Sequence, residues 1–346
     1  MHWTRGHTIG HGSTAAVSVA ISHCSGEIFA VKSTELSRSE FLQKEQKILS
    51  TLNSLYVVGY KGYDVTREND KVKFNLMMEY MPHGILIDEI RKQGGRLNEK
   101  LIGYYTKQIV EGLDYLHSKG IVHCDIKGHN ILIGKTGVKI GDFGCSKLVD
   151  VMTIGGTPMY MAPEVARGEE QGFAADIWAL GCTIIEMATG GSPWTKVNNP
   201  ASLLYHIAFS DQTPEIPKFL SSQARDFLNI CLRRDPKQRC SAKQLLNHPF
   251  LDLNTSSPTS ILDQCIWNSN EESENIDDPT QEISRLTDFP LQRVRKLELQ
   301  SRKPDWEFDE RWITVRKRSE DLLTCKNGMT TAFSTCNCQD NIFLLQ

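Results

Sequence analysis

The chain has 346 residues, enough for one large domain or two modest ones with a sizeable hydrophobic core. A hydrophobic fraction of 40% and a charged fraction of 23% are ordinary for a soluble globular protein, and a net charge of −3 excludes a strong overall attraction to nucleic acid or anionic membrane. The first ten residues lack the apolar core of a signal peptide, and the longest apolar stretch, residues 177–188, is too short for a bilayer and contains Glu186.

The ten cysteines are scattered through the chain without a secretory signal, which favours reduced thiols in the cytoplasm or nucleus. The pair in "CNC", Cys336 and Cys338, has no second cysteine or histidine cluster nearby, so we expect no metal site there.

The N-terminal third of the chain is rich in strand signals. Residues 6–34 alternate apolar and small residues, with a turn at Ser25-Gly26, and "VVGYKGYDV" and "KFNLMMEYM" predict two more strands around a polar "TREND" turn. Between these two groups, apolar residues over 37–52 recur at helical spacing.

After Gly84 the chain becomes mainly helical, and residues 101–120 form an amphipathic stretch that ends in a Lys-Gly helix-stop signal. A small β-rich lobe followed by a large α-rich lobe is therefore the predicted α+β architecture.

Composition shifts after Leu251. From Asn254 to Asp288 acids outnumber bases eight to one and helical periodicity is absent, which predicts a flexible linker. The basic clusters "RVRKLELQSRK" and "VRKRSE" beyond it indicate either a partner-binding or nuclear-targeting tail, or a solvated and mostly disordered one.

Glycine-rich "IGHGSTAAV" predicts a phosphate-binding loop between two strands. Gly10 and Gly12 let the backbone approach a phosphate closely, although glycine pairs also form ordinary hairpins, and Ala15 replaces the third glycine of G-x-G-x-x-G. The candidate nucleotide-binding residues are Ile9, Gly10, His11, Gly12, Ser13, Thr14, Ala15, Ala16 and Val17.

Lys32 ends the strand "FAVK", and Glu45 lies on the helix that follows. A buried lysine needs a counter-charge, and a Lys–Glu pair directs the ammonium at the α- and β-phosphates of a nucleotide. Taken singly, the two residues also fit a surface lysine and a surface acid.

The stretch "IVHCDIKGHNILIG" and the following "VKIGDFG" bring oxygen-bearing side chains into two adjacent turns. Asp142 and Asn130 suit Mg²⁺, which prefers oxygen ligands. Asp125 remains to accept the proton of an attacking hydroxyl, and Lys127 to neutralise a transferring phosphoryl group. The alternative, turn-forming Asp and Asn residues, has to explain this whole ordered set as coincidence.

From Trp3 to about Leu251 these motifs resemble a eukaryotic protein kinase. Three further stretches carry the same resemblance: "GGTPMYMAPEV", "DIWALGC" and "RRDPKQRCSAKQLLNHPFL". The resemblance implies a kinase domain over 3–251, with an N-lobe over about 3–81 and a C-lobe over about 82–251, and a regulatory tail over 252–346. It also implies ATP and Mg²⁺ as cofactors.

Further residue roles follow from the resemblance. In "MMEYMPHG", Met78 would be the gatekeeper, and the backbones of Glu79 and Met81 would bind adenine. The remaining implied residues are a Glu164–Arg239 pair, Asp176 on the helix that anchors the catalytic loop, and Thr157, which would bridge Asp125 and Lys127.

The subtype resembles Ser/Thr kinases, because "DIKGHN" follows the catalytic aspartate. "WTRG" and "GTPMYMAPEV" resemble MEKK-type MAP kinase kinase kinases, and "HCDIKG" and "EQKILSTL" are similar to small plant members, several of which act in abscisic acid and stress signalling. The resemblance implies MAP kinase kinases as substrates. From the sequence we also expect regulators that bind the tail and no obligate oligomer. The rival interpretations are a Ser/Thr kinase at another cascade position and a pseudokinase scaffold.

Cys124 stands where many kinases have an arginine that binds a phosphate on the activation loop. A short, normally neutral thiol cannot make that contact, so we expect activity with little or no activation-loop phosphate, although Cys124 is also consistent with drift at a small buried position. Lys147 matches a second basic position near the phosphate pocket, and the candidate acceptors are Ser146 and Thr153.

Overall fold

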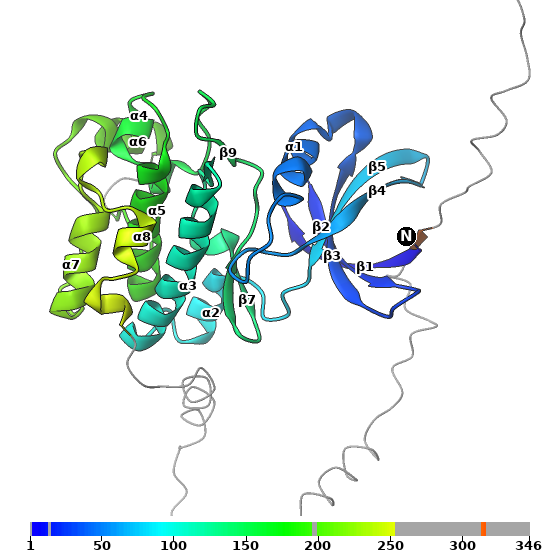
Figure 1. Ribbon diagram of the computed structural model, residues 1–346, viewed down its shortest axis with the longest axis horizontal. Helices are drawn as coiled ribbons and strands as arrows, with labels where there is room; N and C mark the ends of the chain where they lie inside the picture. The colour runs from blue at the N-terminus through cyan, green and yellow to red at the C-terminus, as the bar shows by residue number, and fades with distance from the viewer. Residues whose placement is uncertain (1, 13–14, 196–198, 253–312, 316–346) are drawn as a thin grey trace, which may run out of the picture.

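The computed structural model describes residues 2–12, 15–195, 199–252 and 313–315. These residues form two lobes, one built on a β-sheet and the other mainly of helices (Figure 1). This is the bilobal α+β architecture predicted from the sequence. Ser13, Thr14, the predicted acidic linker and the "CNC" pair lie outside the described residues.

The N-lobe is an antiparallel sheet with one long helix. Its strands follow in the spatial order β10-β1-β2-β3-β5-β4, so consecutive strands are mostly neighbours and only β10 comes from a distant part of the chain. The elements are β1 (Trp3–His11), β2 (Ala16–Ser22), β3 (Ile28–Glu35), α1 (Glu40–Leu49), β4 (Tyr60–Glu68), β5 (Lys71–Glu79) and β10 (Ile313–Val315).

The hairpin between β4 and β5 is tighter than predicted. The "TREND" stretch was expected to be a turn, yet Thr66, Arg67 and Glu68 belong to β4 and pair with β5. Only Asn69 and Asp70 form the connection, both with positive φ (49° and 62°). Two residues with positive φ give a turn whose twist matches the flanking strands, so the strands run on to the turn itself.

A buried polar network joins β1 to the opposite side of the N-lobe sheet. The Arg5 guanidinium donates to Glu68 Oε1 (2.9 Å), Asn75 Oδ1 (2.8 Å) and Ser33 Oγ (2.9 Å), and it lies 5.0 Å from the ring of the fully buried Trp3. Sequence reasoning used "WTRG" only as a family marker. In the structure it anchors β1 across the sheet.

The C-lobe contains helices, short strands and single 3₁₀ turns. The helices are α2 (Leu86–Lys92), α3 (Glu99–Ser118), α4 (Pro163–Ala166), α5 (Phe173–Thr189), α6 (Pro200–Phe209), α7 (Ser222–Cys231) and α8 (Ala242–Leu245). The strands are β6 (Ile121–Val122), β7 (Ile131–Gly134), β8 (Gly137–Ile140) and β9 (Lys147–Leu148). β6 pairs with β9 and β7 pairs with β8, both antiparallel.

The long helices follow their sequence signals. α3 begins after Asn98, whose side chain accepts the Leu101 N–H, and ends within two residues of the predicted stop. α5 is apolar on nearly every face and lies inside the lobe, ending at Gly190, whose φ of 70° suits a residue without a side chain.

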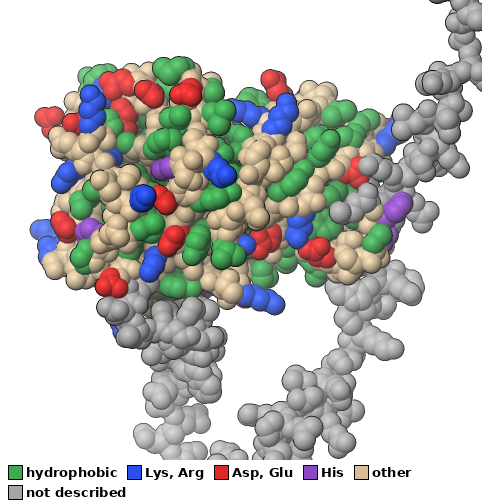
Figure 2. Space-filling view, viewed as in Figure 1, with side chains coloured by type: hydrophobic (Ala, Val, Ile, Leu, Met, Phe, Trp, Pro, Cys, Tyr) green, Lys and Arg blue, Asp and Glu red, His purple; other side chains and the backbone are tan. Residues whose placement is uncertain are grey.

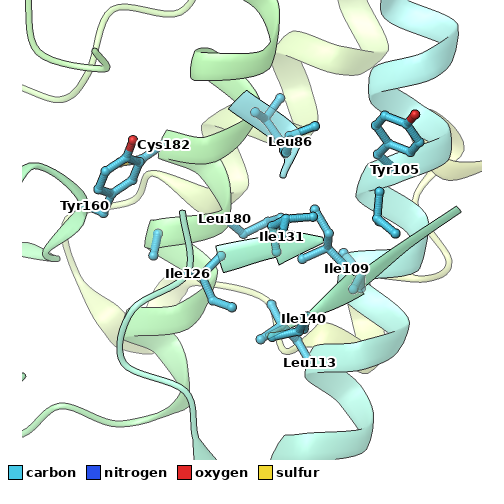
Figure 3. Close-up of a cluster of buried hydrophobic side chains, with 14 of the residues drawn as sticks. Leu86, Tyr105, Ile109, Leu113, Ile126, Ile131, Ile140, Tyr160, Leu180 and Cys182 are labelled. Atoms are coloured by element: carbon cyan, nitrogen blue, oxygen red, sulfur yellow. The ribbon is translucent and has the colours of Figure 1, made fainter. Parts of the chain in front are cut away.

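The C-lobe core lies directly beneath the loop 123–130 that precedes β7. Figure 3 shows Ile126, in the middle of this loop, and Ile131, directly after it, within an apolar cluster that also contains Ile109 of α3 and Leu180 of α5. Ile126 and Ile131 are both fully buried. Hydrophobic burial therefore fixes the loop at its middle and at its C-terminal end, and its polar residues project from a rigid base.

The surface that Figure 2 shows carries Lys, Arg, Asp and Glu side chains interspersed, in keeping with the small net charge. In the described part of the chain, no helix combines the length and the apolar character that crossing a membrane requires.

Candidate active site

Lys32 links three elements of the site. Its Nζ donates to Glu45 Oε2 of α1 (2.7 Å) and to Asp142 Oδ1 in the segment after β8 (2.9 Å). Glu45 also accepts the Phe143 N–H (3.3 Å), so α1, β3 and the "DFG" turn meet at one point. The sequence predicted the Lys32–Glu45 pair, and the structure places Asp142 on the same ammonium.

Ionisation at this point follows from burial and opposite charge. Burial lowers the pKa of Lys32, but the two carboxylates outweigh it and raise that pKa to about 12. Burial raises the pKa of Asp142, yet the Lys32 charge and hydrogen bond leave it below its ordinary value. Lys32 and Asp142 therefore face each other as a charged pair at neutral pH.

Asp125, Lys127 and Thr157 form a closed triangle of hydrogen bonds. The Lys127 Nζ donates to Asp125 Oδ2 (2.8 Å) and to Thr157 Oγ1 (2.6 Å), and the Thr157 hydroxyl donates to Asp125 Oδ1 (2.7 Å). Asn130 Nδ2 donates to Asp125 Oδ2 (3.0 Å) and to its backbone oxygen (2.8 Å). Both oxygens of the Asp125 carboxylate are thus oriented by neighbours.

Helix α5 contacts the catalytic loop, residues 123–130, through the side chain of Asp176. Asp176 accepts the N–H groups of His123 and Cys124, each at 2.9 Å. Cys124 has a φ of 68°, an uncommon conformation for a residue with a Cβ, and these two bonds stabilise it. Asp176 therefore shapes the turn that presents Asp125.

Arg239 and Glu164 form a buried ion pair with two contacts of 2.6 and 2.7 Å. The Arg239 side chain is inaccessible to solvent, and it also donates to Ala174 O (2.8 Å) and lies over the Trp178 ring. The pair joins α4 to the C-terminal part of the lobe, as the sequence predicted for these two positions.

The glycine-rich loop connects β1 and β2. Gly10 pairs with Val17 and His11 with Ala16, and the Gly12 N–H donates to the Ala15 oxygen (2.8 Å). Ile9 and Ala16 lie in β1 and β2 on either side of this turn. Ser13 and Thr14, also predicted nucleotide contacts, lie outside the described residues.

At the hinge between the lobes, Met78 and Met81 are buried. The Glu79 side chain binds other protein groups and is not placed to bind a nucleotide. Its carboxylate accepts from Lys139 Nζ (2.8 and 2.9 Å) and from the Gly59 N–H (3.0 Å). The Glu79 N–H donates to Gly59 O, so the backbone group left for adenine at this residue is its carbonyl.

The two candidate phosphate acceptors differ in access. Ser146 is fully buried and its hydroxyl donates to His123 O (3.2 Å), so the structure argues against it as an acceptor. Thr153 is exposed. Lys147 is also buried, and its Nζ donates to Val151 O (2.6 Å) within the same loop.

The sequence motifs indicated no role for Glu186, Tyr160 or Gln171. Glu186 accepts the Tyr160 hydroxyl (2.6 Å) and the Gly128 N–H (3.1 Å), which ties α5 to both the catalytic loop and the segment after Thr157. Burial raises the pKa of Glu186. A carboxylate inside an otherwise apolar run was the available signal, since a buried charge needs partners.

Comparison with known proteins decides the family. The family model described as "Protein kinase domain" matches residues 3–251. The chain belongs to the protein kinase family. Its relatives include "Mitogen-activated protein kinase kinase kinase 17" of Arabidopsis thaliana, 48% identical over 93% of this chain and 95% of the relative. "Mitogen-activated protein kinase kinase kinase 18" of the same plant is 48% identical over 92% of this chain and all of the relative. "Mitogen-activated protein kinase kinase kinase A" of Dictyostelium discoideum is 39% identical over 75% of this chain and 30% of the relative.

Within the protein kinases, these similarities place the chain among the MAP kinase kinase kinases and make it a Ser/Thr protein kinase. Kinases of this family generally use ATP and Mg²⁺. A pseudokinase scaffold would be expected to lack one of four residues, and all four are present: Lys32, Asp125, Asn130 and Asp142. Hydrogen bonds join Lys32 to Asp142 and Asn130 to Asp125.

Proposed function

We propose that this kinase transfers the γ-phosphoryl group of ATP, with Mg²⁺, to a serine or threonine in the activation loop of a MAP kinase kinase. The observation that carries the proposal is the hydrogen-bonded triangle of Asp125, Lys127 and Thr157. The printed names of the similar plant proteins support this cascade position.

The donor set fits magnesium. Asp142 offers a carboxylate and Asn130 an amide oxygen, both hard ligands, and no group of three His, Cys, Asp or Glu residues in the described ranges could hold a metal alone. Few protein ligands would be enough, because phosphate and water oxygens also bind magnesium. Asp142 and Asn130 would hold Mg²⁺, which would neutralise charge on the phosphates of ATP.

The protein positions the acceptor and accepts its proton. The Asp125 carboxylate takes the hydroxyl hydrogen as the acceptor oxygen bonds to the γ-phosphorus and the bond to the β–γ bridging oxygen breaks, its electron pair leaving with ADP. Lys127 balances charge on the transferring group, while Thr157 keeps Asp125 in one orientation. Lys32, held by Glu45, is placed for the α- and β-phosphates.

We further place the kinase in a stress or hormone cascade, with abscisic acid the first stimulus to test, in the cytoplasm, the nucleus or both. Supporting the cascade is the resemblance of "HCDIKG" and "EQKILSTL" to small plant members of the family. Supporting the location are the scattered cysteines, which favour a reducing compartment. The tail after Leu251 is where we expect regulators to bind.

The test uses the purified full chain and a panel of catalytically inactive MAP kinase kinases. Each substrate is paired with a control in which its activation-loop serines and threonines are alanine. We expect phosphoserine or phosphothreonine in the loop of at least one substrate and none in its control. Predominant phosphotyrosine would contradict the substrate class, and transfer only to proteins outside the panel would favour another cascade position.

A further inference from the structure

Gln171 connects the activation segment, residues 145–161, to the catalytic loop, residues 123–130. Its side-chain Oε1 accepts the Gly155 N–H (3.0 Å), and its Nε2 donates to Gly155 O (3.0 Å) and to Cys124 O (3.4 Å). Gln171 is 3% exposed, so these bonds form away from water. A buried amide whose oxygen and nitrogen both have backbone partners is rigid and costly to disturb.

Both partners lie next to the reacting centre. Cys124 directly precedes Asp125, and Gly155 lies two residues before Thr157, whose hydroxyl donates to Asp125. Gly156 has a φ of 113°, and a Cβ there would collide with the Cys124 oxygen, so the two loops pass in close contact. The Gln171 amide therefore binds both the residue before Asp125 and the segment that carries Thr157, which orients Asp125.

The groups that form this junction are uncharged. Burial, and then the nearby Asp176 carboxylate, raise the pKa of the Cys124 thiol far above its ordinary value, which keeps it neutral. Lys147 already donates to Val151 O, within the activation loop. Position 124 has no arginine that could bind a phosphate. The activation segment is connected to the catalytic loop through the neutral amide of Gln171 instead.

We propose that Gln171 is a positioning residue for phosphoryl transfer, which joins the activation segment to the catalytic loop without a phosphate. This proposal rests on the proposed kinase function. It assigns to Gln171 the ordering of the loop that charge-assisted bonds to a phosphate provide elsewhere.

The test compares Gln171→Met, which keeps the length and loses the hydrogen bonds, with Gln223→Met, the same change at an exposed glutamine of α7. Both are made in the full chain, with and without Thr153→Ala, and treated with phosphatase. We expect Gln171→Met to lower kcat at least about tenfold, about 1.4 kcal/mol, while KM for ATP stays within about twofold. Gln223→Met and Thr153→Ala should match the parent.

A purely structural Gln171 would instead lower thermal stability and leave kcat of the folded fraction unchanged, which would overturn the proposal. A loss of more than about tenfold in the phosphatase-treated parent or in Thr153→Ala would overturn the phosphate independence.

Amide hydrogen exchange keeps the test separate from catalysis. The Gly155 N–H should be protected in the parent and exchange faster in Gln171→Met. Equal exchange in both would overturn the connection even in an active enzyme. Protection at Gly155 together with ATP binding but no transfer to any substrate would count against the proposed kinase function alone.

Discussion

At the scale of single residues, both oxygens of the Asp125 carboxylate accept hydrogen bonds from neighbouring side chains. Thr157, Lys127 and Asn130 all contact its carboxylate. Such a group is positioned to accept a proton from a hydroxyl in one direction only.

We expect Asp125→Asn to retain ATP binding and lose turnover by about 10²- to 10⁴-fold, because the amide keeps the shape but cannot accept the proton. Steady-state kinetics with a MAP kinase kinase, together with a nucleotide-binding titration, measures both. Turnover near that of the parent would remove Asp125 from its assigned role.

Residue identities at the site were predictable because their order and spacing are specific. Lys32, Glu45, Asp125, Asn130 and Asp142 are far apart in sequence, yet each belongs to a short motif. Contacts made by isolated residues were not predictable. Gln171 belongs to no motif, and its partners lie 16 and 47 positions away. Burial of Ser146 was missed for the same reason, since no local pattern records what packs against it.

At the scale of elements, buried charged groups stabilise the N-lobe sheet in addition to apolar packing. Glu68 of β4 accepts from Arg5, Thr66 and Lys73 at 2.9 to 3.0 Å, and its side chain is 4% exposed. Burial raises the pKa of Glu68, but these donors outweigh it and hold the pKa below the ordinary 4.5. Because the pKa of Glu68 is lower in the folded state than in the unfolded state, its ionisation stabilises the fold above about pH 4.5. This stabilisation is lost as the pH falls through the folded-state pKa.

Glu68→Gln should therefore lower the free energy of unfolding at pH 7 by about 1–3 kcal/mol, because the Arg5 and Lys73 charges lose their partner. The difference from the parent should shrink below pH 4.5. Urea denaturation from pH 7 to pH 3 measures it. Glu169→Gln is the control. Glu169 is exposed and pairs with Arg167 at the surface, so its substitution should change the free energy of unfolding little. A Glu68→Gln effect independent of pH would contradict the charge assignment.

At the scale of the whole molecule, the two lobes were predictable and one connection was not. β10 pairs with β1 in antiparallel register, Trp3 with Val315 and Arg5 with Ile313, so part of the predicted tail belongs to the N-lobe sheet. A three-residue strand has no periodicity to detect, and its partner lies some 310 residues away in the chain.

Truncation after Asp252 should nevertheless leave a folded kinase, because β1 to β5 also pair with one another and the Arg5 hydrogen bonds join residues of those strands. We expect peptide-kinase activity within about twofold of the full chain, measured alongside the circular dichroism spectrum, and changed partner binding. An insoluble or unfolded product would place the domain boundary further along the chain.

The environment of Lys32 also sets its chemical reactivity. Only a neutral amine attacks an acylating reagent, and the two carboxylates that raise the pKa of Lys32 to about 12 leave a smaller neutral fraction at pH 7 than an ordinary lysine has. Amine-directed probes should therefore label Lys32 slowly beside exposed lysines such as Lys119, as peptide mass spectrometry can follow. Replacing Glu45 with glutamine removes one of the two carboxylates and should speed the labelling, so probe reactivity at this lysine becomes a measure of whether α1 is docked.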